Sequence, residues 1–113
     1  MTRIGDTLGY ARVSTQDQSL TGQVAQLQKA GAIRVFEDVV SGKQFDRRGL
    51  AALVDHARRG DSLAIKRLER LGRSLKELLE TVENLKAQNI GLISLEERIN
   101  TTPAPGELIF HVF

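Results

Sequence analysis

The sequence predicts an α/β fold in which a mainly parallel sheet is flanked by helices. Short apolar runs typical of β-strands alternate along the chain with stretches of helical periodicity, which is the pattern of βαβ units. The chain has 113 residues, of which 41% are hydrophobic and 27% charged, enough for one compact core. No internal repeat or linker interrupts it. We therefore expect one domain over residues 1–113.

The first half of the chain predicts two strands and two helices. Residues 7–13 predict the first strand, which precedes a helix that ends at Gly31. Residues 33–37 predict the second strand, and a polar loop follows over residues 38–46. The second helix has Asp46 as a candidate N-cap and Gly60 at its end. The apolar faces of the two helices comprise Leu20, Val24 and Leu27, and then Leu50, Leu53, Val54 and Ala57.

The second half predicts two further strands, over residues 62–68 and 90–95, with a helix between them. Ser74 and Glu77 fit a capping box at the start of that helix. Pro105 suits the first turn of a last helix that runs into Phe113 and has no further turns to continue its apolar stripe. We therefore expect the chain to stop at the start of a longer helix. The apolar face of the middle helix comprises Leu75, Leu78, Leu79, Val82 and Leu85.

Composition excludes several classes of protein. The absence of cysteine rules out disulfides and thiolate metal sites, and it makes a reducing cytoplasm the default location. No apolar run approaches the roughly 20 residues that span a bilayer, and the N-terminus lacks the apolar core of a signal peptide. Arginine supplies 11 of the 16 basic residues, which weakly favours phosphate or nucleic acid over an ordinary solvated surface.

Polar residues gather at the expected carboxyl ends of three strands, where an open α/β sheet binds its ligands. Arg12, Arg47, Arg70 and Arg73 would form an electropositive pocket there, next to the helix N-terminus at Ser74. A hydroxyl within it, from Ser14 or Ser41, could attack phosphorus without a metal ion. Taken singly, each residue also has a structural interpretation, as a helix cap, a salt-bridge partner or a core side chain. The remaining polar residues near this edge are Tyr10, Gln18, Gln23, Asp38 and Glu69.

Other catalytic classes find less support. The chain has neither a Gly-rich phosphate-binding loop followed by Lys-Ser/Thr nor a GxGxxG motif after the first strand, which disfavours nucleotide hydrolysis. Its two histidines, His56 and His111, lie far apart in sequence. The sequence therefore does not support a Ser-His triad or a histidine-rich metal site.

Three runs of residues together resemble the serine recombinase family of resolvases and invertases. They are Gly9-Tyr10-Ala11-Arg12-Val13-Ser14-Thr15, Phe36-Glu37-Asp38-Val39-Val40-Ser41-Gly42 and Leu68-Glu69-Arg70-Leu71-Gly72-Arg73-Ser74. Their order and intervals match the family across nearly the whole chain. The resemblance implies a resolvase-like catalytic domain in which Ser14, not Ser41, is the nucleophile.

The resemblance also implies roles for the other residues and for DNA. Arg12, Arg70 and Arg73, with Arg47 beside them, would activate a DNA phosphodiester for attack by Ser14, giving a 5′-phosphoseryl linkage and a free 3′-hydroxyl. Gln23, Asp38 and Ser41 would support the site, with Tyr10, Gln18 and Glu69 as further members. No metal or other cofactor is implied. The implied partners are double-stranded DNA and, in a full-length parent protein, a homodimer and a synaptic tetramer.

Two departures from the family pattern affect what this chain can do. Glu69 stands where the family usually has aspartate, and its extra methylene could shift Arg70. The chain also ends before most of the long dimerisation helix and the helix-turn-helix domain, so we expect weak DNA binding and little recombination from these residues alone. Two alternatives remain: an inactive recombinase-like module or remnant that serves protein contacts, and a small phosphate-ester hydrolase.

Overall fold

The computed structural model describes most of the chain. The described residues are 5–14, 20–40, 47–72, 74–101, 103–104 and 107–108.

A five-stranded sheet in the order β2-β1-β3-β4-β5 forms the centre of the domain. β1 (Thr7–Ser14) pairs in parallel with β2 (Arg34–Val40) on one side and with β3 (Ser62–Ile65) on the other, and β3 pairs in parallel with β4 (Gly91–Ser94). β5 (Ile99–Asn100) is the last strand in this order and pairs with β4 in antiparallel orientation. The predicted α/β fold with a mainly parallel sheet is therefore confirmed.

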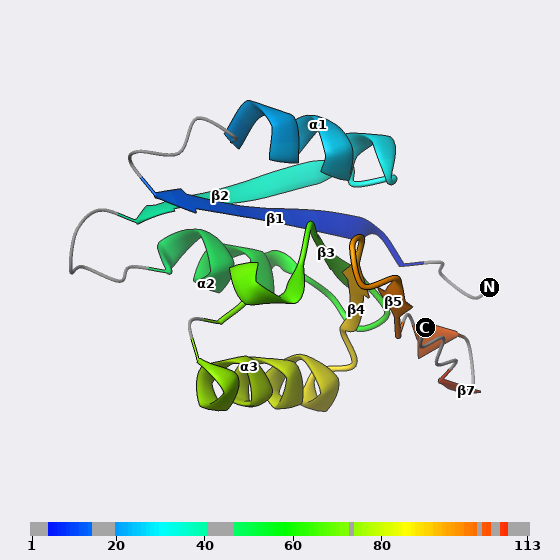
Figure 1. Cartoon of the computed structure of the whole chain (residues 1–113). Coiled ribbons are helices and arrows are strands. Elements are labelled where there is room, and N and C mark those ends of the chain that lie inside the picture. Colours follow the sequence, from blue (N-terminus) through cyan, green and yellow to red (C-terminus); the bar gives the residue numbers. More distant parts are fainter. Residues whose placement is uncertain are drawn as a thin grey trace.

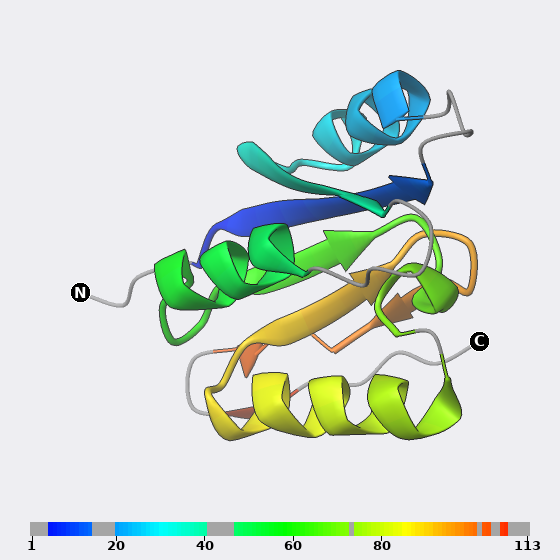
Figure 2. The same ribbon diagram turned by 90° about the vertical axis from the view of Figure 1, so that its left-hand side faces the viewer.

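Helices cover both faces of the sheet (Figure 1). α1 (Leu20–Lys29) lies on one face, and α2 (Arg48–His56) and α3 (Leu75–Ala87) lie on the other. A short 3-10 helix, η1 (Leu68–Arg70), follows β3. Figure 2 shows that β1, β3 and β4 run in the same direction, toward the side of the molecule where η1 lies.

Two apolar clusters fill the space between the sheet and these helices. The larger lies under α2 and α3 and includes Leu8 and Tyr10 of β1, while the smaller lies under α1 and includes Ala11 of the same strand. Because successive side chains of a strand point to opposite faces, Arg12 shares the α2 and α3 face with Tyr10. Alternation along β1 thus directs one arginine toward the expected site.

Two of the predicted helix ends are confirmed in detail. α1 ends at Lys29 and Gly31 follows with a φ of 108°, a backbone conformation that glycine adopts without steric cost. At the start of α3, Ser74 is the N-cap and its hydroxyl accepts a hydrogen bond from the backbone N–H of Glu77 at 3.1 Å.

Other predicted boundaries were wrong in the first half of the chain. β1 extends one residue further, to Ser14, and β2 runs from Arg34 to Val40, so Asp38 lies inside a strand and does not open a loop. The N-cap position of α2 is occupied by Arg47, not Asp46, and the helix ends at His56, before Gly60. Gly60 has a φ of 96° in the turn after the helix, which explains why glycine stands there.

Boundaries were also wrong in the second half. The third strand ends at Ile65, because the chain turns into η1 and the N–H of Leu68 is bound by the carboxylate of Glu97. The fourth strand is Gly91–Ser94, and sequence patterns did not predict the short β5 that follows a turn with Arg98 at a φ of 57°.

The expected helix from Pro105 to Phe113 is contradicted where the chain is described. β6 (Pro103–Ala104) and β7 (Glu107–Leu108) form an antiparallel pair, and Ala104 pairs with Glu107. The intervening residues in the sequence are Pro-Gly, a dipeptide that favours turns. A short helical segment does not by itself repay the cost of helix nucleation, and at the described residues strand pairing is found in its place. Among the described residues, no helix is long and apolar enough to cross a membrane.

Candidate functional site

The candidate site lies at the carboxyl edge of the parallel strands, on the face covered by α2 and α3 (Figure 2). Four segments meet there: the end of β1 with Arg12, the end of β2 with Asp38, the start of α2 with Arg47, and η1 with Arg70. Arg12 and Asp38 are direct neighbours in the β1–β2 register. The structure therefore brings together residues that lie up to 58 positions apart in the sequence, from Arg12 to Arg70.

Arg12 is partly buried and held by the backbone of η1. Its Nη2 donates a hydrogen bond of 2.6 Å to the carbonyl oxygen of Glu69. Burial lowers the pKa of the Arg12 guanidinium, and the positive charges of Arg47 and Arg70 lower that pKa further, while Tyr10 acts in the opposite direction. The side chain remains charged, since arginine pKa values lie far above neutrality. Because its charge is disfavoured by these neighbours, binding an anion beside it is favourable.

Tyr10 and Asp38 form a buried polar pair behind the arginines. The Tyr10 hydroxyl donates a hydrogen bond of 2.6 Å to Asp38 Oδ2, and both side chains are buried. Burial raises the pKa of Tyr10 well above its ordinary value of 10.0, and the hydrogen bond to Asp38 raises it further. Tyr10 therefore stays protonated at neutral pH and acts as a hydrogen-bond donor, which makes it unsuited to be a nucleophile.

Asp38 also holds the N-terminus of α2. Its Oδ1 accepts from the N–H of Gly49 at 2.6 Å, and its Oδ2 accepts from the N–H of Leu50 at 3.1 Å. These are backbone donors of the first helical turn, which have no partner within the helix. A Cβ on Gly49 would lie 2.3 Å from the carbonyl oxygen of Glu37, so glycine permits this close approach of α2 to β2. The carboxylate that was expected in a loop is thus a cap supplied by a neighbouring strand.

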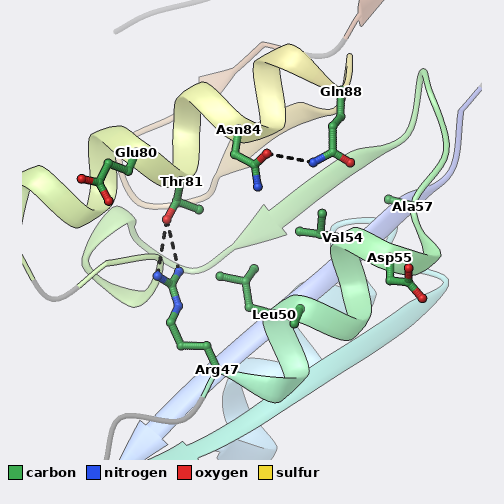
Figure 3. A pocket seen from close by; sticks show the side chains of 10 residues that line it. Arg47, Leu50, Val54, Asp55, Ala57, Glu80, Thr81, Asn84 and Gln88 are labelled. Carbon is green, nitrogen blue, oxygen red and sulfur yellow. Dashed lines mark hydrogen bonds between the residues drawn. The ribbon is translucent and has the colours of Figure 1, made fainter.

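Arg47 reaches from the start of α2 to η1 and α3. Its Nη2 donates to the carbonyl oxygen of Leu71, and both Nη1 and Nη2 lie 3.4 Å from Thr81 Oγ1. Its Nη1 also lies 3.6 Å from Glu77 Oε1. Figure 3 shows Arg47 and Thr81 facing each other at one end of the groove between α2 and α3.

The segment that carries Glu69 and Arg70 is anchored by the turn after β4. Glu97 accepts from the N–H of Leu68, at 3.3 Å for each carboxylate oxygen, and it also accepts from the Ser94 hydroxyl. The Glu69 side chain is 62% exposed and pairs with Arg67 at 3.0 Å. The carboxylate of Glu69 thus points outward, and its backbone carbonyl is the group that contacts Arg12.

The remaining predicted site residues divide into two groups. Gln23 of α1 is buried, and its Nε2 donates a hydrogen bond of 3.3 Å to the carbonyl oxygen of Arg12 from the other face of the sheet. Ser14 is the last residue of β1, in register with Val40, and its side chain lies outside the described residues. Gln18, Ser41 and Arg73 also lie outside the described residues.

Several residues with contacts at this site were missed by sequence patterns. Gly49, Glu77, Thr81 and Glu97 contact site residues or the segments that carry them. Glycine at the second position of a helix was a signal for close backbone approach, because glycine weakens a helix elsewhere. Glu77 was marked only as a capping-box residue of the helix, and no spacing rule marks Thr81 or Glu97.

The arrangement suits an anion more than a metal ion. Among the described residues, no group of three or more His, Asp or Glu side chains could hold a metal. Arg12 and Arg47 instead bind the carbonyl oxygens of Glu69 and Leu71, the two sequence neighbours of Arg70, so the three arginines gather at one segment. Guanidinium groups bind the oxygens of phosphate in planar, bidentate geometry.

Comparison with known proteins gives concordant results. A family model described as "Resolvase, N terminal domain" matches residues 7–113. The DNA-invertase of Enterobacteria phage P7 is 42% identical over 105 residues, covering 93% of this chain and 56% of the relative. The serine recombinase gin of Escherichia phage Mu is 41% identical, with 93% and 54% covered.

A transposon relative shows the same pattern. The Transposon Tn552 resolvase of Staphylococcus aureus is 39% identical over 108 residues, covering 94% of this chain and 55% of the relative. The chain therefore spans about half the length of the curated relatives it matches. With a family model that matches nearly all of its residues, this chain belongs to the resolvase N-terminal domain family.

Proposed function

We propose that this chain is the catalytic domain of a site-specific serine recombinase, with residues 1–113 forming that domain and Ser14 as the nucleophile. The observation that carries the proposal is the convergence of Arg12 and Arg47 on the segment that carries Arg70, at the edge where β1 ends in Ser14. Membership of the resolvase family, with relatives named as DNA-invertases, a serine recombinase and a resolvase, supports DNA as the substrate.

In the proposed reaction, the Ser14 hydroxyl oxygen attacks a phosphorus of the DNA backbone. The new bond joins Ser14 Oγ to the 5′-phosphate, the bond from phosphorus to the 3′-oxygen breaks, and the proton lost by serine is balanced by the one gained at the 3′-hydroxyl. Attack of a 3′-hydroxyl on the phosphoserine then rejoins the strands and restores Ser14. One phosphodiester is exchanged for another, so the scheme requires no energy cofactor.

The arginines stabilise the charge that develops on the non-bridging oxygens during both attacks. Arg12 and Arg70, with Arg73, contact the phosphate in this scheme, and Arg47 lies beside them. Tyr10, Gln23 and Asp38 fix the strands and the α2 N-terminus that present Arg12 and Arg47. Gln18, Ser41 and Glu69 complete the proposed set. Double-stranded DNA is the proposed partner, in the cytoplasm.

We further propose that recombination belongs to a longer protein that contains this domain. A dimerisation helix and a helix-turn-helix domain beyond Phe113 would form the homodimer and the synaptic tetramer and would read the DNA sequence. The match to about half of each relative is consistent with this division. Phosphate contacts give affinity without sequence selectivity, so the domain by itself would bind DNA weakly.

A covalent trapping experiment tests the proposal. The protein, carrying any native residues that follow Phe113, is mixed with supercoiled plasmid containing the DNA that flanks its gene, and detergent is added to expose protein joined to DNA. We expect an adduct that Ser14→Ala abolishes and that Ser41→Ala, which removes the other candidate hydroxyl, weakens without abolishing. A folded, DNA-bound protein without any adduct would contradict the proposal and favour a non-catalytic module. Turnover of a simple phosphomonoester would favour a hydrolase instead.

A further inference from the structure

Arg47 begins on one helix, yet its guanidinium contacts side chains of another. It occupies the N-cap position of α2, and it lies 3.4 Å from Thr81 Oγ1 and 3.6 Å from Glu77 Oε1, both on α3. Its side chain is 21% exposed, and that of Glu77 is 31% exposed. The two helices are thus connected by a partly buried polar contact at the edge where the arginines gather.

The Thr81 hydroxyl is oriented to accept from Arg47. A hydroxyl has one proton to donate and two lone pairs to accept. The Thr81 proton is directed to the carbonyl oxygen of Glu77 in the preceding helical turn, at 2.9 Å. The Thr81 oxygen is therefore left as an acceptor, and Arg47 has only donors to offer it. This polarity gives Thr81 a defined role toward Arg47 that valine of the same shape could not fill.

Packing between α2 and α3 does not supply the same restraint. The two helices border an open groove of about 670 Å³, whose walls include Leu50 and Val54 of α2, Asn84 of α3, and Gln88 directly after α3 (Figure 3). Because side chains do not fill this groove, contacts at its end, where Arg47 meets Thr81, carry more of the connection between the helices.

We infer that Thr81 and Glu77 are positioning residues, which hold the Arg47 guanidinium through α3 in the orientation needed for phosphoryl transfer; this rests on the proposed function. A long arginine side chain loses rotamer freedom when it is held in one orientation beside a phosphate. Contacts to Thr81 and Glu77 already restrict the Arg47 rotamers in the folded protein. Arg47 therefore loses less rotamer freedom when the transition state forms. Neither residue touches the phosphate, and their effect appears in the rate more than in DNA affinity.

A double-mutant cycle in the covalent trapping assay tests this inference. Thr81→Val keeps the shape and removes the acceptor, whereas Thr81→Ser keeps the acceptor. We expect Thr81→Val to lower the adduct-forming rate at saturating DNA by about tenfold, with less than about a twofold change in DNA affinity. Thr81→Ser should restore most of the rate. Glu77→Gln should lower it by about threefold, and Glu83→Gln, an exposed α3 residue, serves as the charge control.

The decisive comparison is made in an Arg47→Lys background. There, Thr81→Val should cause no further loss of rate, because the geometry that Thr81 supports is already gone. The same tenfold loss in both backgrounds would overturn the inference, as would a wild-type rate for Thr81→Val. Coupling of Arg47 and Thr81 in urea unfolding without coupling in the rate would also overturn it, since the contact would then serve stability alone. A wild-type protein without a Ser14-dependent adduct would refute the proposed function, and this inference with it.

Discussion

Two buried aspartates at opposite edges of the sheet both accept hydrogen bonds from backbone N–H groups, but only one of them lies at the proposed site. Asp61 precedes β3 at the amino edge, where its carboxylate accepts from the N–H of Asp6 at 2.9 Å and the N–H of Arg58 at 2.8 Å. Asp38, at the carboxyl edge, accepts from two N–H groups of α2 and from the Tyr10 hydroxyl. Both side chains are buried.

What separates the two aspartates is what lies around them. Asp38 binds Tyr10 and the start of α2, and both lie next to Arg12 and Arg47. Asp61 instead joins backbone segments that have no role at the proposed site. A buried carboxylate bound by backbone N–H groups is therefore evidence of a structural tie in both places, and proximity to the arginines adds the functional role at one of them.

The largest effect is expected from a substitution of Arg12, the neighbour of Asp38 in the β1–β2 register. Arg12→Ala should lower the rate of adduct formation by about 10³-fold, because it removes a charge that stabilises the transition state in a partly buried site. Arg34→Ala serves as the control, since Arg34 lies on β2 with its guanidinium 4.5 Å from the Phe36 ring and away from the site. A comparable loss in Arg34→Ala would show that general positive charge, not the site, determines the rate.

Asp38→Ala should lower both stability and rate. Two helix N–H groups and the buried Tyr10 hydroxyl would lose their acceptor, which we expect to reduce the free energy of unfolding by about 3 kcal/mol. Urea unfolding measures this loss, and the trapping assay measures the rate under conditions where the variant stays folded. If the folded variant cleaves DNA at the wild-type rate, Asp38 is as purely structural as Asp61.

Asp61→Ala should affect stability alone. Loss of the acceptor for Asp6 and Arg58 should lower the free energy of unfolding by about 2 kcal/mol. We expect the adduct-forming rate of the folded variant to stay within about twofold of wild type. A large loss of rate at full folding would remove the distinction between the two edges of the sheet.

Tyr10→Phe should have the smallest effect, and one that depends on pH. Loss of the hydrogen bond to Asp38 should cost about 1 kcal/mol at neutral pH. Because the pKa of Tyr10 is raised in the folded protein above its ordinary value of 10.0, the unfolded chain releases this proton first as pH rises. The stabilisation by Tyr10 is therefore complete below about pH 10 and declines above it. The free energies of unfolding of the two proteins, measured between about pH 8 and about pH 11, should therefore converge as pH rises. A constant difference over this range would contradict a raised pKa of Tyr10.

The fold could be predicted from the sequence because its signals are local. Apolar runs and helical spacing gave each main strand and helix, and Gly31 and Ser74 marked helix ends correctly. The sequence patterns failed where a residue distant in sequence supplies the hydrogen-bond partner of a backbone group. Asp38 was expected to begin the polar loop after the second strand, and its partners on α2 follow it by 11 and 12 positions.

The candidate site could be predicted in part. Alternation along β1 placed Tyr10 and Arg12 on the same face, as the structure has them. The choice of Ser14 over Ser41, which came from the family resemblance, stays a prediction. The contacts of Arg47 with Thr81 and Glu77, and of Glu97 with the N–H of Leu68, connect segments about 30 positions apart. No periodicity encodes such contacts, because they depend on how helices and turns are placed in three dimensions.

Identification of the residue joined to DNA tests the central claim most directly. The trapped adduct is digested with nuclease and trypsin, and peptides are analysed by mass spectrometry. We predict a nucleotide linked through its 5′-phosphate to Ser14, on the peptide of residues 13–29, which trypsin releases after Arg12 and Lys29. A nucleotide on any other residue, or a linkage through a 3′-phosphate, would contradict the account.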